Sequence, residues 1–498
     1  MTTSPLPVFR RAPAILPTAI AALLVVGVSI YWLAGSIAQE KYRNVLIAAV
    51  LVQVGWVVMR WRMSVYAFMV FVIVEGFLVN YFYQIPELNL LKDAFIISLF
   101  GVLALQLVAH SVFPFPRTIW SLPFFAFSAV YLLQVFNPSL PNVLVGLVGV
   151  RVNLLFFLLM PVAFWFFDSR ERVLHFFQFL FWVSLPVSFF GIVQYLAGPS
   201  LMTSLSPGFS RAVYYAYGLR PTQEAIYFRT FSTFVHTGGF GMYLSFMMLV
   251  SVALWMIPSL RRFRVWILGG FIVQFIALLT TGSRGAFVWF LLALGMLFLL
   301  QRGRSRLVPL MLILPLILWG SMFVVGPGFV ERFGSILDLD MVQGRNIPLM
   351  YGWLTESMKT DWAGLGAGYA SVASRHAGVT PLNLIVVENG LAKIRFEAGL
   401  PGFFLYVIFI LSLMLDCLHA PARTQDNEVR WIVGASAAFM FVCISSVTLG
   451  TPFDASPTNT YLWFFAGLLA RAGYLAKQPI SQQVISPSPA PAMSLHGN

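Results

Sequence analysis

Residues 326–402 read GPGFVERFGSILDLDMVQGRNIPLMYGWLTESMKTDWAGLGAGYASVASRHAGVTPLNLIVVENGLAKIRFEAGLPG and form the longest polar interruption in an otherwise apolar sequence. Apolar runs long enough to cross a membrane lie on both sides, so this stretch is predicted to be a loop between membrane helices. We expect the loop to lie on the extracytoplasmic side and to carry the chemistry. Its charged and titratable residues include Arg332, Arg345, Lys359, Asp361, Arg375, His376, Glu388, Lys393, Arg395 and Glu397.

The composition of the 498-residue chain is that of a membrane protein. It is 59% hydrophobic and 10% charged, whereas a soluble domain carries about 25% charged residues. The formal net charge of +13 is explained by Lys and Arg at cytoplasmic helix ends rather than by nucleic acid, because the basic residues are spread over those ends. Cys417 and Cys443 lie near or inside apolar runs, which supports neither a disulfide framework nor a cysteine metal site. We expect no protein-held metal and no cofactor.

Apolar runs of about 20 residues predict an all-α polytopic membrane protein with about 14 transmembrane helices and a long, partly helical extracytoplasmic loop. The connections on one side of these runs are rich in arginine and those on the other side are poor in it, so both termini are predicted to be cytoplasmic. The runs lie near residues 14–35, 44–60, 64–82, 93–112, 118–136, 142–166, 172–196, 233–257, 263–281, 285–301, 307–325, 400–418, 430–449 and 459–475.

The predicted spans and loops divide the chain into six parts. They are an N-terminal transmembrane bundle (1–197), a first long extracytoplasmic loop (198–232), further transmembrane helices (233–325), the large extracytoplasmic catalytic loop (326–400), C-terminal transmembrane helices (401–477) and a disordered cytoplasmic tail (478–498).

A short amphipathic helix is predicted inside the large loop. Its apolar residues follow helical spacing and form one stripe, so we expect it to lie along the membrane surface with that stripe inward. Gly364, Gly366 and Gly368 follow the helix and end it. The stripe consists of Ile347, Met350, Tyr351, Leu354 and Met358.

Two charged residues lie inside predicted spans, Glu75 in FVIVEGFLVNY and Arg151 in NVLVGLVGVRVNLLFFLLM. Ions inside a membrane are costly and normally face a partner in the bundle. Their similar predicted depth makes Glu75 and Arg151 candidates to pair with each other. Such a pair has two interpretations, a structural role in the bundle and a direct role in binding substrate.

Two arginines stand at the predicted outer boundary. Arg229 precedes the span at 233–257, and Arg284 lies in the short turn TTGSRGAF. A planar guanidinium binds phosphate oxygens in pairs, so the two suit a diphosphate. The alternative is that both only reach toward lipid headgroups. His236 is expected to be a packed polar residue rather than a ligand.

Carboxylates of the segment VVENGLAKIRFEAGLPG could act as a general base. Glu388, followed by Asn389, precedes the span at 400–418, and Glu397 lies nine residues later. The structural alternative is that Glu388 or Glu397 caps a helix or pairs with Arg395.

Four sequence features, taken in order and with their spacing, resemble the O-antigen ligase and polymerase superfamily of bacterial membrane enzymes, which act on polyprenyl-diphosphate-linked glycans. They are RTFSTFVHTGG from Arg229, TGSRGA around Arg284, GLGAGY from Gly364 and ENGLAKIRFEAGLPG from Glu388. The resemblance covers residues 225–420. The first half is similar only in being helical membrane protein, with some similarity to exopolysaccharide polymerases around VEGFLVNYFYQIPELNLLKDAF.

One position departs from that family. Its pattern has His-Asn shortly before Glu-x-Gly, and in ligases that His is linked to catalysis. Here Glu388-Asn389 stands in its place, with Glu397-Ala398-Gly399 in register. The missing His favours a polymerase over a ligase.

The resemblance implies a metal-independent glycosyltransferase that uses a polyprenyl-diphosphate-linked oligosaccharide donor at the outer face and polymerises the repeat units of an O-antigen or exopolysaccharide. Arg284 and Arg229 would bind the diphosphate, and Glu388 would deprotonate the acceptor hydroxyl. The further substrate-binding candidates are Arg345, Arg151, Asn389, Glu397 and His376.

The implied setting is the bacterial inner membrane, with periplasmic long loops and the lipid bilayer, the glycan donor and a glycan acceptor as partners. Other polysaccharide export proteins are candidate partners, and nucleic acid is not. One alternative is an O-antigen ligase that transfers the glycan to lipid A-core or protein. Another is a flippase for the same lipid-linked sugar, although no internal repeat of the kind common in transporters is present.

Overall fold

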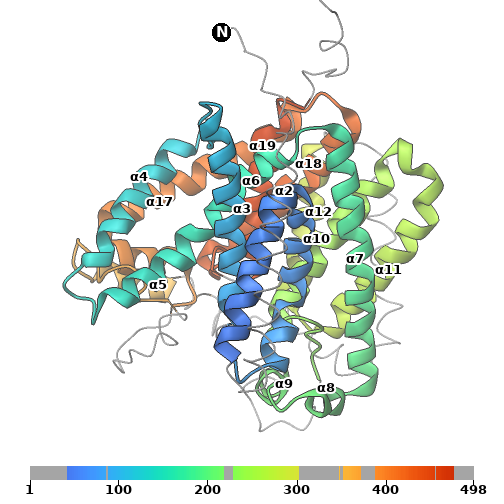
Figure 1. Ribbon diagram of the computed structural model, residues 1–498, viewed down its shortest axis with the longest axis horizontal. Coiled ribbons are helices and arrows are strands. Elements are labelled where there is room, and N and C mark those ends of the chain that lie inside the picture. The colour runs from blue at the N-terminus through green and yellow to red at the C-terminus, as the bar shows by residue number, and fades with distance from the viewer. Residues whose placement is uncertain are drawn as a thin grey trace, which may run out of the picture.

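The computed structural model describes residues 42–85, 88–217, 228–301, 347, 351–371, 387–454 and 456–475 (Figure 1). These parts contain helices and turns and no strand. The longer helices are α2 (Tyr42–Tyr81), α3 (Asn89–Ala109), α4 (Ser121–Leu133), α5 (Val143–Leu154), α6 (Leu159–Phe166), α7 (Arg170–Ala197), α10 (Thr237–Met256), α11 (Arg264–Thr280), α12 (Arg284–Leu300), α17 (Gly390–Arg423), α18 (Asn427–Ser445) and α19 (Thr458–Ala472). The shorter ones are α8 (Pro199–Leu205), α9 (Phe209–Tyr217), α16 (Trp353–Met358) and the 3₁₀ turns η2 (Gln134–Phe136), η3 (Leu155–Leu158), η4 (Pro258–Phe263) and η10 (Ser446–Thr448).

The chain is an all-α, multi-pass membrane protein, but the predicted count of about 14 spans is not what the described residues contain. Eight helical segments among them are long and apolar enough to cross a membrane, and Ser121–Phe136 and Arg284–Leu300 are shorter apolar helices. Part of the difference lies in α2, which counts as one segment although the non-helical backbone at Arg60 divides it into two helices that correspond to the predicted spans 44–60 and 64–82. The predicted spans 14–35 and 307–325 lie outside the described residues.

The centre of the bundle is formed by α10 and α18. Both helices are buried on nearly every side and pack against each other. A helix that is apolar all round belongs in the interior, because it has no polar face to turn outward. Around them, α7, α11, α12 and α19 complete the core, and α4 and α17 lie side by side at one edge (Figure 1).

Polar side chains define where several helices begin. Each accepts a hydrogen bond from a backbone N–H of the first turn, which the helix itself cannot satisfy. The residues that do so are Asn142 for α5, Ser169 for α7, His236 for α10, Asn389 for α17 and Asp426 for α18.

The helices α10, α12 and α17 all begin at one end of the bundle, here named the site end. An added Cβ on Gly241 of α10 would lie 2.8 Å from Ala286 of α12, which places their first turns together. The segment between η10 and α19 joins them to α17, because the N–H of Gly390 donates to the carbonyl of Gly450 at 3.1 Å. The site end is therefore built from three helix starts and one connecting segment.

Arginines of the predicted cytoplasmic connections gather at the opposite end and pair with acids there. Arg170 contacts Asp426 and Glu428, and Arg62 contacts Asp168. These pairs join α7 to α18 and α2 to the start of α7. The arginine-rich connections to which Arg62 and Arg170 belong thus lie at one common end of the bundle.

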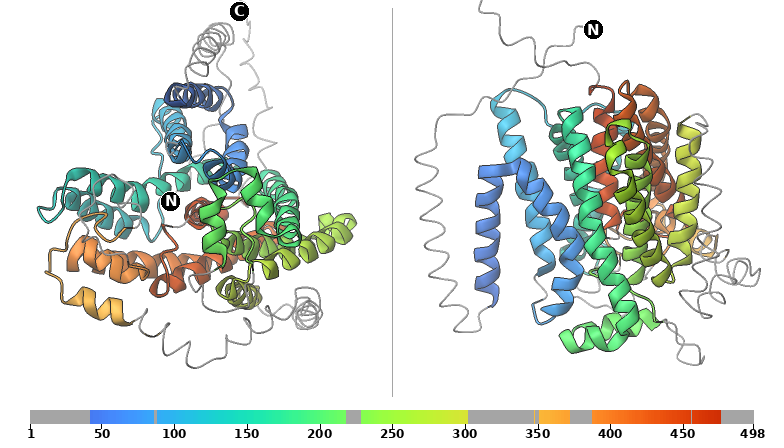
Figure 2. Two further views of the ribbon diagram at one scale, coloured as in Figure 1. Left: turned by 90° about the horizontal axis from the view of Figure 1, so that it is seen from below. Right: turned by 90° about the vertical axis from the view of Figure 1, so that its right-hand side faces the viewer.

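The predicted loop regions contain helices. The connection after α7 holds α8 and α9, and α17 begins at Gly390, inside the stretch predicted to be a loop. The predicted amphipathic helix is represented by α16, which lies beside α17 (Figure 2). Its neighbours Ile347 and Tyr351 and its last residue Met358 are exposed. The apolar stripe is therefore not buried against the bundle, and its outward position suits contact with lipid.

Candidate functional site

A break in α17 organises the candidate site. The helix is interrupted at Gly399, whose φ of 68° lies in the region that favours glycine. The break frees backbone groups near it, and residues 362–366 satisfy them. Leu365 N–H donates to the carbonyl of Phe396 at 2.7 Å, and Leu400 N–H donates to the carbonyl of Trp362 at 2.8 Å. The glycine-rich segment GLGAGY is thereby fixed to the broken helix.

Glycine is needed along this segment because backbones touch there. An added Cβ on Gly364 would lie 2.4 Å from the nitrogen of Gly399, and one on Gly368 would lie 2.3 Å from the carbonyl oxygen of Val145. Both glycines also have positive φ. The segment is therefore held between α17 and α5, rather than standing free as a loop.

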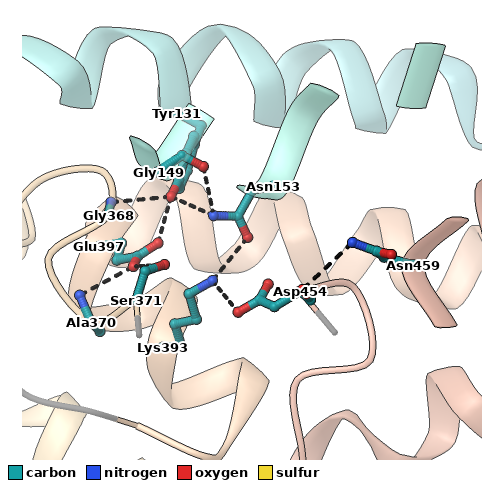
Figure 3. A network of polar contacts seen from close by, with 10 residues as sticks. All are labelled: Tyr131, Gly149, Asn153, Gly368, Ala370, Ser371, Lys393, Glu397, Asp454 and Asn459. Atoms are coloured by element: carbon teal, nitrogen blue, oxygen red, sulfur yellow. Dashed lines mark hydrogen bonds and ion pairs between the residues drawn. The ribbon is translucent and has the colours of Figure 1, made fainter. Parts of the chain in front are cut away.

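Glu397 lies at the centre of this packing and is fully buried. Its Oε2 accepts a hydrogen bond from the hydroxyl of Tyr131 at 2.5 Å, and its Oε1 accepts from Ala370 N–H at 3.1 Å and from the hydroxyl of Ser371 at 3.2 Å (Figure 3). A buried carboxylate is tolerated only when its oxygens are satisfied in this way. Glu397 thus fixes the glycine-rich segment to the bundle.

The contacts continue beyond Glu397. Asn153 Nδ2 donates to the hydroxyl oxygen of Tyr131 at 2.7 Å, and Lys393 Nζ donates to Asn153 Oδ1 at 3.2 Å (Figure 3). Lys393 also pairs with Asp454 Oδ2 at 2.5 Å. We name Glu397, Tyr131, Asn153, Lys393 and Asp454 the buried polar network. Lys393 and Glu397 are four residues apart and share one face of α17.

A small cavity lies beside this network at the start of α17. It has room for about one water-sized group. Lys393 and Asp454 form its polar wall together with Thr451, and Tyr406 and Phe453 contribute aromatic surface. Polar groups of both hydrogen-bonding types beside aromatic walls are common in sites for small polar ligands.

Arg229 and the turn that precedes Arg284 come together at the site end. Arg229 Nε donates to the carbonyl of Thr281 at 3.0 Å, three residues before Arg284, which is the first residue of α12. A second hydrogen bond, of 2.8 Å between the hydroxyls of Thr230 and Thr280, also links the segment before α10 to the end of α11. Both arginines are half-buried. Arg229 is thus bonded to the turn that leads into Arg284.

His236 lies close to Arg229 and caps α10. Its Nδ1 accepts from Gly239 N–H at 3.0 Å. Desolvation by the protein around it, followed by the positive charge of Arg229, lowers the pKa of His236, although the residue keeps exposed surface. A neutral imidazole suits its capping bond, since that nitrogen must accept. We name Arg229, His236 and Arg284 the arginine rim.

The predicted pairing of Glu75 with Arg151 is wrong, because each residue has a different partner. Glu75 pairs with Lys92 at 2.8 Å, and Arg151 pairs with Asp93 at 2.5 Å. Lys92 and Asp93 are neighbours on α3, so one cluster contains both predicted residues. Its opposite charges balance, which makes burial tolerable. Ser456 donates to Glu75 at 3.4 Å, which connects the cluster to the site end.

The other predicted residues of this region have different positions. Glu388 is exposed just before α17, and among the described residues it makes no hydrogen bond or ion pair. Asn389 is buried and caps α17 by accepting from Ala392 N–H at 3.0 Å. The suggested pair between Glu397 and Arg395 is absent from the described contacts, because Arg395 donates to the carbonyls of Thr360 and Asp361. Arg345 and His376 lie outside the described residues.

Sequence reasoning missed Tyr131, Asn153 and Asp454. A signal existed for Lys393, since a lysine four residues before a glutamate on an apolar helix indicates a buried polar face. No comparable signal marks Tyr131, which is one aromatic residue among many.

Among the described residues, no group of three or more His, Cys, Asp or Glu side chains is placed to hold a metal ion. Neither a scan against models of known protein families nor a search of curated proteins finds a match to this chain.

Proposed function

We propose that this protein is a membrane glycosyltransferase that uses a polyprenyl-diphosphate-linked oligosaccharide as donor at the extracytoplasmic face of the bacterial inner membrane. The observation that carries the proposal is the arginine rim, where Arg229 is bonded to the turn that leads into Arg284. Two guanidinium groups beside the N-terminus of a 17-residue helix form a site suited to a diphosphate, because the helix dipole adds positive potential there.

In this reaction the acceptor hydroxyl attacks the anomeric carbon of the donor glycan. The new glycosidic C–O bond forms as the bond between that carbon and the diphosphate oxygen breaks, and a carboxylate takes the hydroxyl proton. The leaving diphosphate carries the developing negative charge, which the arginine rim stabilises. A single displacement of this kind inverts the anomeric configuration.

Glu388 is the carboxylate proposed to take the proton. It is exposed at the site end and is not engaged by other described residues, so it is free to meet a substrate. Glu397 is unsuited to this task because three hydrogen bonds already occupy its oxygens and its side chain is fully buried. Glu397 instead acts as a positioning residue for the segment at the site end.

The experiment that tests the proposal is deletion of the gene followed by glycan analysis of the cells. Accumulated single lipid-linked repeats indicate a polymerase of O-antigen or exopolysaccharide, which we favour. Accumulated full-length lipid-linked chains indicate a ligase. Arg284→Ala and Glu388→Ala should reproduce the deletion at normal protein level, whereas Arg261→Ala, at an exposed arginine of η4, should not. Full glycan output from both site variants would contradict the proposal.

A flippase for the same lipid-linked sugar is the second candidate, and one observation favours it. The cluster of Glu75, Lys92, Asp93 and Arg151 places paired charges inside helices long enough to span a membrane, as pathways in transporters do. A flippase would leave its lipid-linked substrate on the cytoplasmic leaflet in the deletion strain. A glycosyltransferase would leave it on the outer leaflet, where an added glycosidase reaches it.

A further inference from the structure

The cavity beside Lys393 and Asp454 contains polar groups with unused hydrogen-bonding capacity. Lys393 has three N–H donors, of which Asn153 and Asp454 take two. Among the described residues, Asp454 Oδ1 accepts no hydrogen bond, and the hydroxyl of Thr451 makes none. The cavity therefore offers one charged donor and one carboxylate acceptor to whatever enters it.

This combination matches an alcohol. A hydroxyl group accepts one hydrogen bond and donates another, so its oxygen can meet Lys393 while its hydrogen meets Asp454. The cavity has room for about one such group, and the rest of a sugar ring would extend toward the opening. Tyr406 and Phe453 provide apolar surface for the carbon atom that carries the hydroxyl.

The charges of the region disfavour an anionic ligand. The carboxyls of Glu397 and Asp454 are close to a single ammonium, that of Lys393, so the cavity has no excess positive charge. A phosphate would meet Asp454 at close range, which costs free energy in a poorly solvated place. The arginine rim has the opposite balance. A neutral group thus belongs in the cavity, and an anionic group belongs at the rim.

A short segment after the cavity also connects it to the helix start beside the rim. Asp454 stands two residues before Ser456, and two residues span about 7 Å at most. The carbonyl oxygen of Ser456 lies 3.3 Å from the position of an added Cβ on Gly239, in the first turn of α10. His236 of the rim caps that same turn. One ligand that reaches the rim and another in the cavity would therefore be close together.

We propose that this cavity binds one hydroxyl group of the glycan acceptor, with Lys393 donating to the hydroxyl oxygen and Asp454 accepting from it. The inference rests on the proposed glycosyltransferase function and adds an acceptor site to it. Donor and acceptor are then recognised by different chemistry, the diphosphate by arginines and the alcohol by an ammonium–carboxylate pair. The buried polar network holds that pair in place, since Asn153 accepts a hydrogen bond from Lys393.

Two measurements on the full chain test this site. The first is glycan output in a deletion strain that carries each variant. The second is binding of undecaprenyl diphosphate, used as the probe, to the purified protein in nanodiscs. Asp454→Asn should lower output at least about tenfold, because a charge-assisted hydrogen bond is lost. It should leave binding of the probe within about twofold of the unchanged protein.

A second variant keeps the ion pair and fills the cavity. Thr451→Leu places a larger apolar side chain where the hydroxyl would sit, and we expect an output loss of about tenfold with normal protein level. Thr451→Ser is the matched control, because it keeps a hydroxyl and leaves the cavity open. If Asp454→Asn misfolds, the comparison of Thr451→Leu with Thr451→Ser decides the question.

The outcomes separate this inference from the proposed function. Normal output from Asp454→Asn or from Thr451→Leu would mean that the cavity holds water only, and the acceptor site would be refuted while the glycosyltransferase stands. Loss of probe binding in Asp454→Asn would also refute it, because the cavity would then serve the diphosphate. Arg284→Ala that retains both output and probe binding would refute the proposed function itself.

Discussion

The arginine rim and the buried polar network occupy the same end of the bundle and differ in almost every property. The two arginines of the rim are half-buried and His236 is exposed, and Arg229 is anchored to the carbonyl of Thr281. In the network, Glu397 and Lys393 are buried, and Tyr131 and Asn153 link them by hydrogen bonds. The difference indicates a division of work, in which the rim meets a substrate and most of the network holds the site in shape.

The largest expected effect comes from breaking the network. Glu397→Ala would leave the hydroxyl of Tyr131 and the N–H of Ala370 buried without their partner. We expect a loss of about 3–5 kcal/mol in the free energy of unfolding, measured by thermal unfolding in detergent together with the amount of protein in the membrane. Glu397→Gln keeps the shape and should lose less. Full stability with lost glycan output would instead place Glu397 in the chemistry.

A smaller effect is expected at the rim. Arg229→Lys keeps the positive charge and loses the planar fork, so glycan output should fall about tenfold at unchanged protein level. Arg261→Lys, at the exposed surface of η4, is the control. If Arg229→Lys behaves like Arg261→Lys, then charge alone suffices at the rim and paired binding of phosphate oxygens is not used.

The smallest effect is expected at the cap of α17. Asn389→Ala removes the bond to Ala392 N–H and should lower the free energy of unfolding by about 1 kcal/mol. Asn389→Asp can still accept that bond and should be nearly neutral. Glycan output per folded molecule should not change in either variant. A selective loss of output in Asn389→Ala would return this residue to the substrate-binding group.

The sequence singled out the two arginines of the rim and little of the network, for physical reasons. Arg229 and Arg284 are charged residues at the edges of apolar runs, where a charge is conspicuous and the fold has few ways to hide it. Tyr131 and Asp454 belong to the network through contacts with α17 between residues that are 266 and 61 positions apart in the sequence. Such contacts depend on helix packing, which periodicity alone does not specify.

The same reasoning explains the errors in the fold. Hydropathy identified the apolar helices and correctly separated the two halves of α2, which the non-helical backbone at Arg60 divides. It predicted partners for Glu75 and Arg151 from depth, whereas Lys92 and Asp93 on α3 supply them. Charge inside a span predicts that a partner exists and does not say which one.

The backbone hydrogen bonds between residues 362–366 and the broken part of α17 limit how segments of this chain can be exchanged with those of another protein. Because Phe396 and Leu400 find their backbone partners in Leu365 and Trp362, a graft that exchanges only the glycine-rich segment would separate groups that complete one another. Residues 362–366 and the broken part of α17 must therefore be exchanged together. A workable exchange cassette would therefore run from Thr360 through Gly402, cutting inside the helix rather than at its start.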